Sequence, residues 1–131
     1  MKNFDPNAFY FLPLGGSGEI GMNLNLYGFQ NQWIMIDLGI SFENKSGIEV
    51  IMPNPQFIVE RRDKLVGLVL THAHEDHIGA IPYLWPQLRC PIYATPFTAS
   101  VVRFKLSEAG LLEEVPLHVI EDDRVVTLDP F

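Results

Sequence analysis

The residues that most clearly carry chemistry lie in the segment THAHEDHIGA (71–80), which holds three of the four histidines in the chain. His72 and His74 follow an apolar run, and in an extended chain residues i and i+2 project to the same side. Their two imidazoles can therefore converge on one metal ion. Asp76 and His77 come where we expect the chain to turn into a helix, so they can face a second ion close by. The spacing predicts half of a two-metal hydrolase site.

The donor types narrow the chemistry of this predicted site. Imidazole and carboxylate together suit zinc, and also manganese or iron. Two such ions about 3.5–4 Å apart can hold a hydroxide between them and stabilise the transition-state oxygens of a phosphoryl or acyl substrate. A site with a single ion, bound by His72 and His74 alone, is the alternative. Glu75 is expected to point into solvent, and we give it no ligand role.

Asp37 is the strongest candidate for a supporting residue outside this segment. It closes the apolar run WIMID (33–37), where a carboxylate removed from water needs a polar partner. It could hydrogen-bond a metal-binding histidine or a water at the site; the alternative is a cap on the turn that follows. The glycine-rich segment 15–23 indicates a tight turn. Its Glu19 and Asn23 could line the metal cleft, or they could be exposed turn residues.

Hydrophobic periodicity predicts the elements that must position these residues. Strands are expected at 9–16, 22–29, 33–37, 65–71, 91–94, 117–120 and 124–128, with a hairpin turn at 30–32. A loop is expected over 38–56, a short helical or turn segment over 56–63, a helix over 78–88 that ends near Pro86, and a helix over 96–109. Thr95 is suited to cap the last helix, Pro96 to begin it and Gly110 to stop it, and Phe97, Val101 and Phe104 follow at helical spacing. Hairpins followed by alternating strands and helices predict a mixed α/β layered fold, with at least one face of the sheet covered.

Composition limits the class of protein and its partners. The 131 residues fit one small domain, and no apolar run reaches the roughly 18 residues that a membrane span needs. Nucleic-acid affinity comes largely from Lys and Arg, and this chain has nine of them against sixteen acidic residues, so its charge alone does not predict nucleic-acid binding. The single cysteine, Cys90, fits a reducing cytoplasm and is expected to be a buried thiol. His118, in an apolar stretch, is expected to be an ordinary surface or buried histidine.

Several motifs together resemble a known family. THAHEDHIGA resembles the HxHxDH motif of the metallo-β-lactamase superfamily. The segments LPLGGSGEIGMN, IMIDLGISF, VIMPNPQF, GLVLTHAHEDHIGAIPYL and PIYATPFTASVV look like the N-terminal part of bacterial ribonuclease J, in that order. The resemblance runs from about residue 9 to residue 128.

The resemblance implies a role for each candidate residue. It places His72 and His74 on one zinc ion, Asp76 and His77 on the other, and Asp37 in support of the site. It implies that a hydroxide held between the metals attacks an RNA phosphodiester, with exonuclease action from the 5′ end and endonuclease action. It also implies a cytoplasmic, oligomeric enzyme whose catalytic domain is an αββα sandwich interrupted by a beta-CASP domain; this chain would hold the N-terminal half of the sandwich.

The chain also departs from the family pattern. The family uses a further histidine and a bridging aspartate downstream of this region, and another histidine after the beta-CASP domain, whereas no histidine follows His118 here. We therefore expect residues 1–131 to form a partial domain without the beta-CASP and C-terminal domains, to meet RNA only through the complete enzyme, and to be inactive alone. One alternative is a non-catalytic remnant that self-associates or takes its missing ligands from another chain. The other is a hydrolase of the same fold that acts on thioesters or lactams.

Overall fold

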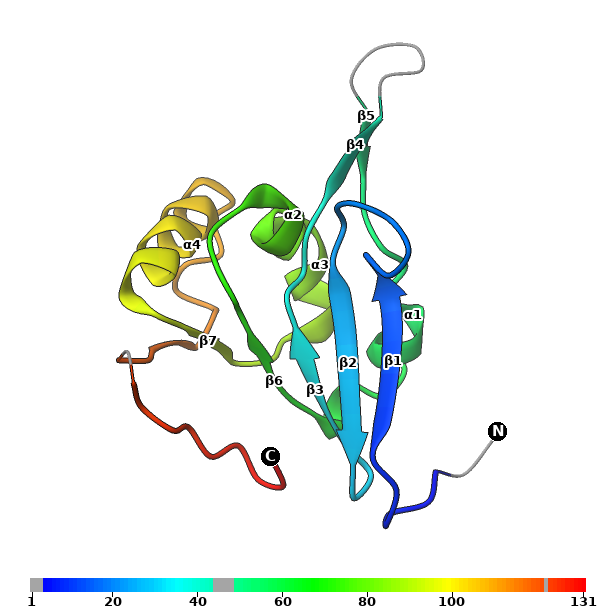
Figure 1. Ribbon diagram of the computed structural model, residues 1–131. Helices are drawn as coiled ribbons and strands as arrows, with labels where there is room; N and C mark the ends of the chain where they lie inside the picture. The colour runs from blue at the N-terminus through cyan, green and yellow to red at the C-terminus, as the bar shows by residue number, and fades with distance from the viewer. Residues whose placement is uncertain (1–3, 44–48, 122) are drawn as a thin grey trace.

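A six-stranded mixed sheet forms the centre of the molecule, which we describe from a computed structural model over residues 4–43, 49–121 and 123–131 (Figure 1). Its strands, in spatial order, are β1 (Tyr10–Gly15), β2 (Leu24–Phe29), β3 (Gln32–Ile36), β6 (Leu65–Val69), β7 (Ile92–Ala94) and β8 (Leu117–Val119). A separate two-stranded sheet pairs β4 (Ser41–Glu43) with β5 (Glu49–Ile51). The helices are α1 (Gln56–Val59), the 3₁₀ helix η1 (Arg62–Lys64), α2 (Glu75–Ile78), α3 (Ile81–Leu88) and α4 (Pro96–Glu108). None of the helices in these ranges is long and apolar enough to cross a membrane.

The sheet changes from antiparallel to parallel at β3. Strands β1, β2 and β3 form an antiparallel meander, and the pairs β3–β6, β6–β7 and β7–β8 are parallel. Between β2 and β3, Gln30 and Asn31 both have a positive φ, of 51° and 62°. Two consecutive left-handed residues form a turn whose twist matches that of the flanking strands. The predicted hairpin at 30–32 is therefore confirmed.

One face of the main sheet is covered by helices. Along β2, the side chains of Leu24 and Leu26 are fully buried, whereas Asn25 and Tyr27, which alternate with them, are half-buried. Ile58 of α1 and Trp85 of α3 belong to the same core, as does Leu106 of α4. Each crossover from one parallel strand to the next thus returns an apolar helix to the same face, and the predicted mixed α/β layered fold is confirmed.

The opposite face of the sheet carries a group of aromatic side chains near its β1 edge, which we call the aromatic face: Phe9, Phe11, Tyr27 and Phe29. Phe11 lies opposite Tyr27 in the β1–β2 register, and their ring centroids are 5.1 Å apart. Phe9 contacts both Tyr27 and Phe29, at 5.9 and 6.3 Å. Phe9 is 62% exposed and Phe11 53%, so this apolar surface is open to solvent in the described part of the chain.

The helix predicted over 78–88 differs from the structure at both ends. The segment forms two helices, because α2 ends at Ile78 and α3 begins at Ile81. α3 also continues through Pro86, which we expected to stop it. A proline inside a helix removes one backbone hydrogen bond. Burial of Trp85 and Leu88 on either side of Pro86 offsets that loss, because tertiary packing supplies most of the stability of short helices.

The helix predicted over 96–109 is confirmed as α4, but the face expected from its spacing is wrong. Phe97 and Phe104 are 74% and 65% exposed, and the side chain of Thr95 makes no capping hydrogen bond. The buried residues are Thr98, Ala99, Val102 and Leu106. The smaller side chains let α4 lie close against β7 and β8, and this close approach decides which face of the helix is buried.

Two further predictions are corrected at the periphery. The loop expected over 38–56 contains β4 and β5; residues 44–48 lie outside the described ranges. The strand expected over 124–128 is absent, and Val125 is 94% exposed. Alternating apolar residues form a strand only where a neighbouring strand supplies hydrogen bonds, and this segment has no such partner among the described residues.

Candidate metal centre

The candidate residues gather where β3 and β6 end. These two strands are adjacent and parallel, so their carboxyl ends meet at the same edge of the sheet. Asp37 follows β3, and the segment from Thr71 to His77 follows β6. Ligands of open α/β sheets bind at this edge, where chain segments leave neighbouring strands.

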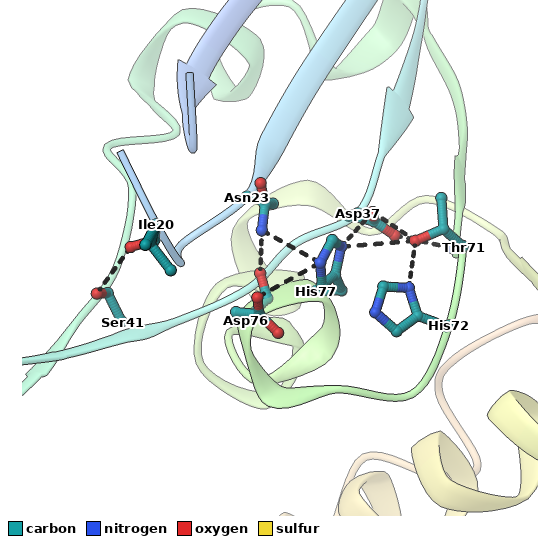
Figure 2. A network of polar contacts seen from close by, with 8 residues as sticks. All are labelled: Ile20, Asn23, Asp37, Ser41, Thr71, His72, Asp76 and His77. Atoms are coloured by element: carbon teal, nitrogen blue, oxygen red, sulfur yellow. Dashed lines mark hydrogen bonds and ion pairs between the residues drawn. The ribbon is translucent and has the colours of Figure 1, made fainter. Parts of the chain in front are cut away.

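Asp37 is the centre of the hydrogen-bond network shown in Figure 2. It is 3% exposed and has a φ of 65°. Its Oδ1 accepts a hydrogen bond from the backbone N–H of Thr71 at 2.8 Å, and its Oδ2 lies 2.7 Å from Nδ1 of His77. Since a carboxylate only accepts, Nδ1 of His77 carries the hydrogen and Nε2 keeps its lone pair. That Nε2 lies 3.4 Å from Oδ2 of Asp76.

Thr71 connects the same carboxylate to a second histidine. Its hydroxyl lies 2.8 Å from Oδ2 of Asp37 and 3.0 Å from Nδ1 of His72. When the hydroxyl donates to Asp37, its oxygen accepts from Nδ1 of His72, which leaves Nε2 of that ring free as well. The ring centroids of His72 and His77 are 4.0 Å apart, and those of His72 and His74 are 4.7 Å apart. One buried carboxylate thus prepares two imidazoles for metal binding, the arrangement usually found behind metal-bound histidines.

The ligand segment is held in place by the backbone of distant residues. α2 has only four residues and could not form alone. Its carbonyl oxygens accept hydrogen bonds from backbone amides of two other segments: Glu75 from Ile40 (3.0 Å), Asp76 from Asn23 (3.0 Å) and His77 from Leu38 (2.8 Å). The chain after β3 therefore runs along α2 and satisfies the carbonyls that a helix end leaves unpaired.

Asn23 and Gly39 make this close approach possible. The side-chain amide of Asn23 donates to the carbonyl oxygen of Asp76 at 2.9 Å and lies 3.4 Å from Nε2 of His77. Asn23 is therefore part of the site rather than an exposed turn residue. A Cβ at Gly39 would lie 1.7 Å from the same carbonyl oxygen of Asp76, so only glycine fits there.

An open groove of about 480 Å³ lies beside Asp76. The glycine-rich segment and β4 form walls of this groove. A hydrogen bond joins these two walls: the hydroxyl of Ser41 donates to the carbonyl oxygen of Ile20 at 3.5 Å. Figure 2 shows this pair beyond Asn23 and Asp76, on the side away from His72. The groove reaches Asp76, whereas none of the three histidines lines it.

The other candidate residues lie outside the metal-binding group. Glu19 accepts a hydrogen bond from the backbone of Gly16 at 3.2 Å. His118 stacks on Tyr93 in β7 and β8, with ring centroids 4.9 Å apart. Glu75 is exposed, as expected, and it also forms an ion pair with Lys105 of α4.

Sequence reasoning missed Thr71 and Lys105. Thr71 stands directly before His72, and its hydroxyl, which can hydrogen-bond a neighbouring histidine, was the signal in the sequence that could have identified it. No local pattern marks Lys105, because only the packing of α4 brings it to Glu75.

The donor set suits a metal ion in type but is incomplete in number. Imidazole nitrogens and a carboxylate suit zinc and related divalent ions. Among residues 4–43, 49–121 and 123–131, however, no group of three or more His, Cys, Asp or Glu side chains is arranged to hold one ion. These residues therefore supply donors of a suitable type, but not a complete set of ligands for an ion.

Similar proteins are found by sequence over most of the chain. Ribonuclease J of Sinorhizobium meliloti is 42% identical over 127 residues, which are 92% of this chain and 22% of the relative. Ribonuclease J 1 of Streptococcus pyogenes is 40% identical over 124 residues, or 93% of this chain and 22% of the relative. The chain thus spans about a fifth of the length of these relatives.

Similarity in structure and a family model agree on the fold. The zinc-bound PqqB of Methylobacterium extorquens matches 82% of this chain and 36% of its own, with a TM-score of 0.57 and 12% identity, and so indicates the fold alone. The model of the metallo-beta-lactamase superfamily matches residues 23–123, a range that contains Asp37 and the whole histidine segment. The chain belongs to the metallo-β-lactamase superfamily.

Proposed function

We propose that this chain is the N-terminal part of a ribonuclease J-like, metal-dependent phosphodiesterase that acts on RNA. The observation that carries the proposal is the Asp37 network, in which one buried carboxylate orients His77 directly and His72 through Thr71. Superfamily membership implies binding of a divalent metal. The similarity to ribonucleases J over more than nine tenths of the chain supports RNA as the substrate of the complete protein.

Each residue has a specific role in this proposal. His72 and His74 hold one zinc ion, and Asp76 and His77 help to hold a second; manganese is the alternative metal. When bound, the metals supply a nucleophile at neutral pH and stabilise the charge that develops on the phosphodiester. Asp37 keeps the hydrogen on Nδ1 of His77, so that Nε2 stays available as a ligand.

The chain by itself is proposed to be a partial domain. The residues 1–131 correspond to about a fifth of the ribonuclease J relatives, and the remaining ligands would come from the rest of such a protein. RNA would meet the acidic chain through the rest of a longer cytoplasmic enzyme, because its net charge of −7 does not favour phosphate contacts. A metal site with ligands on one side positions its ions loosely, so we expect little or no turnover by the isolated chain.

The first test is the zinc content of the purified chain, measured by mass spectrometry after dialysis against zinc. His72→Ala removes a proposed ligand, and His118→Ala removes a histidine outside the site. We expect one weakly held ion, lost in His72→Ala and kept in His118→Ala. Equal zinc content in all three proteins would overturn the proposed site.

Two other outcomes revise the proposal. Two ions per chain, both lost in His72→Ala, would show that the missing ligands come from a neighbouring copy. RNA cleavage by the isolated chain that is abolished by EDTA would overturn the expectation of inactivity.

A second candidate function is that of a non-catalytic, self-associating module. The aromatic face favours it, because an exposed apolar surface at a sheet edge promotes association with another copy. A substitution in the aromatic face, combined with a measurement of the mass of the chain in solution, distinguishes this candidate from the first.

A further inference from the structure

The side of the ligand segment that faces away from β3 is held by a single ion pair. Glu75 stands between His74 and Asp76, and its carboxylate is paired with Nζ of Lys105. The Lys105 side chain is 23% exposed and that of Glu75 is 45% exposed. Lys105 is the only cation paired with Glu75 among the described residues.

The backbone around Glu75 is shaped to direct its carboxylate toward α4. A Cβ at Gly79 would lie 2.6 Å from Oε2 of Glu75, so glycine at this position leaves room for the carboxylate to fold back over the end of α2. Ile40 and Gly79 line the same hollow as Lys105 and Glu75. The carboxylate is thus directed toward Lys105 of α4, with which it is paired.

α4 provides a firm anchor for this contact. Val102 and Leu106 are fully buried, so the helix is fixed on the sheet on either side of the turn that carries Lys105. The opposite side of α2 is fixed by the backbone contacts of Asn23, Leu38 and Ile40 described above. Lys105 therefore contacts this four-residue helix from α4, whereas its backbone hydrogen bonds to other segments come from Asn23, Leu38 and Ile40.

We infer that Lys105 is a positioning residue for the metal site: through Glu75 it holds the backbone between His74 and Asp76 in the conformation that presents both side chains to metal. This inference rests on the proposed function. A partly exposed ion pair contributes little to the free energy of unfolding. Its effect is therefore local, on the opening of α2 and on metal affinity, rather than global.

The first measurement is amide hydrogen exchange of the metal-free chain. Ile78 and Gly79 donate their amides to the carbonyls of His74 and Glu75, so their exchange reports the opening of α2. We expect Lys105→Met and Glu75→Gln each to speed exchange at these two amides by about 2- to 5-fold, with the midpoint of urea unfolding unchanged.

Glu114→Gln provides the matched control for these variants. Glu114 is 47% exposed and pairs with Arg89 at 3.4 Å, far along the chain from the ligand segment. It should leave exchange at Ile78 and Gly79 as in the wild type. Equal exchange in all four proteins, or an equal loss of stability in both Glu→Gln variants, would overturn the inference.

The second measurement is zinc affinity by competition with a chromophoric chelator. We expect Lys105→Met to weaken binding by about 2- to 5-fold, the range that a partly exposed ion pair can supply. Lys105→Arg should restore most of the affinity, and the Lys105→Met, Glu75→Gln double variant should be no weaker than either single one. If wild type and His72→Ala bind zinc equally, the proposed function fails. If only His72→Ala loses zinc and Lys105→Met matches wild type, the positioning role alone fails.

Discussion

The single carboxylate of Asp37 orients two histidine rings, His77 directly and His72 through Thr71. It accepts hydrogen bonds from Thr71 and His77, and Thr71 extends its influence to His72. Its φ of 65° lies in the left-handed region, which aspartate and asparagine tolerate better than most residues. The positive φ favours aspartate or asparagine at this position, and the need for a hydrogen-bond acceptor favours the same two residues.

Asp37→Asn tests this role with little change in shape. Asparagine accepts the same backbone conformation, but its amide N–H₂ would face a histidine nitrogen or the Thr71 N–H. An amide that donates to Nδ1 of His77 would move the hydrogen to Nε2 and block metal binding. We expect zinc affinity to fall about 10–100-fold, measured by chelator competition. Asp5→Asn, at an exposed position, is the control, and an affinity equal to that of the control would contradict the role of Asp37.

Burial raises the pKa of the Cys90 thiol well above its ordinary value. Its side chain is 2% exposed, and burial raises the pKa of the thiol from 9.0 to about 12. The thiol is therefore protonated at neutral pH, and the prediction of a buried thiol is confirmed.

The raised pKa of Cys90 predicts how stability depends on pH. Above pH 9 the thiol ionises in the unfolded chain but stays protonated in the folded one, so its contribution to stability is complete below 9 and is lost as pH rises toward 12. Between pH 8 and pH 10 we expect the free energy of unfolding to fall by about 1 kcal/mol more in wild type than in Cys90→Ala. Urea unfolding at both pH values checks this, and parallel losses in the two proteins would contradict it.

At the scale of elements, the site depends on the chain after β3 lying against α2. Gly39 is at the point of closest approach, where an added Cβ would be 1.7 Å from the carbonyl oxygen and 2.0 Å from the carbonyl carbon of Asp76. Both atoms belong to the backbone, so no side chain can move aside to relieve the overlap.

Gly39→Ala should therefore displace α2 and its ligands. We expect a loss of about 1–3 kcal/mol in the free energy of unfolding, as for overpacked cores, together with loss of zinc binding. Gly110→Ala is the control, because no atom lies within 4 Å of a Cβ there although its φ of 72° adds strain. Zinc binding retained in Gly39→Ala would show that α2 can shift without harm.

The orientation of α4 gives a second prediction at this scale. Leu106 is fully buried and Phe104 is 65% exposed, although both are apolar residues in the same turn. Leu106→Ala should lower the free energy of unfolding by about 2–5 kcal/mol. Phe104→Ala should change it by less than about 0.5 kcal/mol, as for most surface substitutions. Urea unfolding distinguishes them, and a larger loss in Phe104→Ala would mean that the other face of α4 is buried.

At the scale of the whole molecule, the sheet is covered on one side and open on the other. Figure 1 shows α1 and α3 behind β1, β2 and β3, whereas the aromatic face lies on the opposite side. β1 is also an edge strand, with one set of backbone groups unpaired in the described sheet. An open apolar face next to an open edge favours association with a second copy.

Phe11→Glu tests association through this face. Wild type should show an average mass in sedimentation that rises with concentration, and the variant should stay monomeric over the same range, because a buried carboxylate opposes contact. Phe97→Glu places the same charge on α4, at a position 74% exposed, and should behave as wild type. A wild-type chain that is monomeric at all concentrations would contradict self-association.

Sequence by itself determined the chemistry and most of the elements. The spacing of His72, His74, Asp76 and His77 predicts a metal site, and the structure brings these residues together with Asp37. Hydrophobic periodicity predicts the strands of the main sheet and α4. These features are local, since they depend on residue types and on spacings of a few positions.

Tertiary structure decided what depends on distant partners. The segment 124–128 has the pattern of a strand but no neighbour to pair with, and α3 passes Pro86 because its flanking residues are buried. The contacts of Asn23 with Asp76 and of Lys105 with Glu75 join residues far apart in the chain. No local pattern encodes such contacts, because packing of the whole core sets the distance between elements, and that distance determines which polar groups meet.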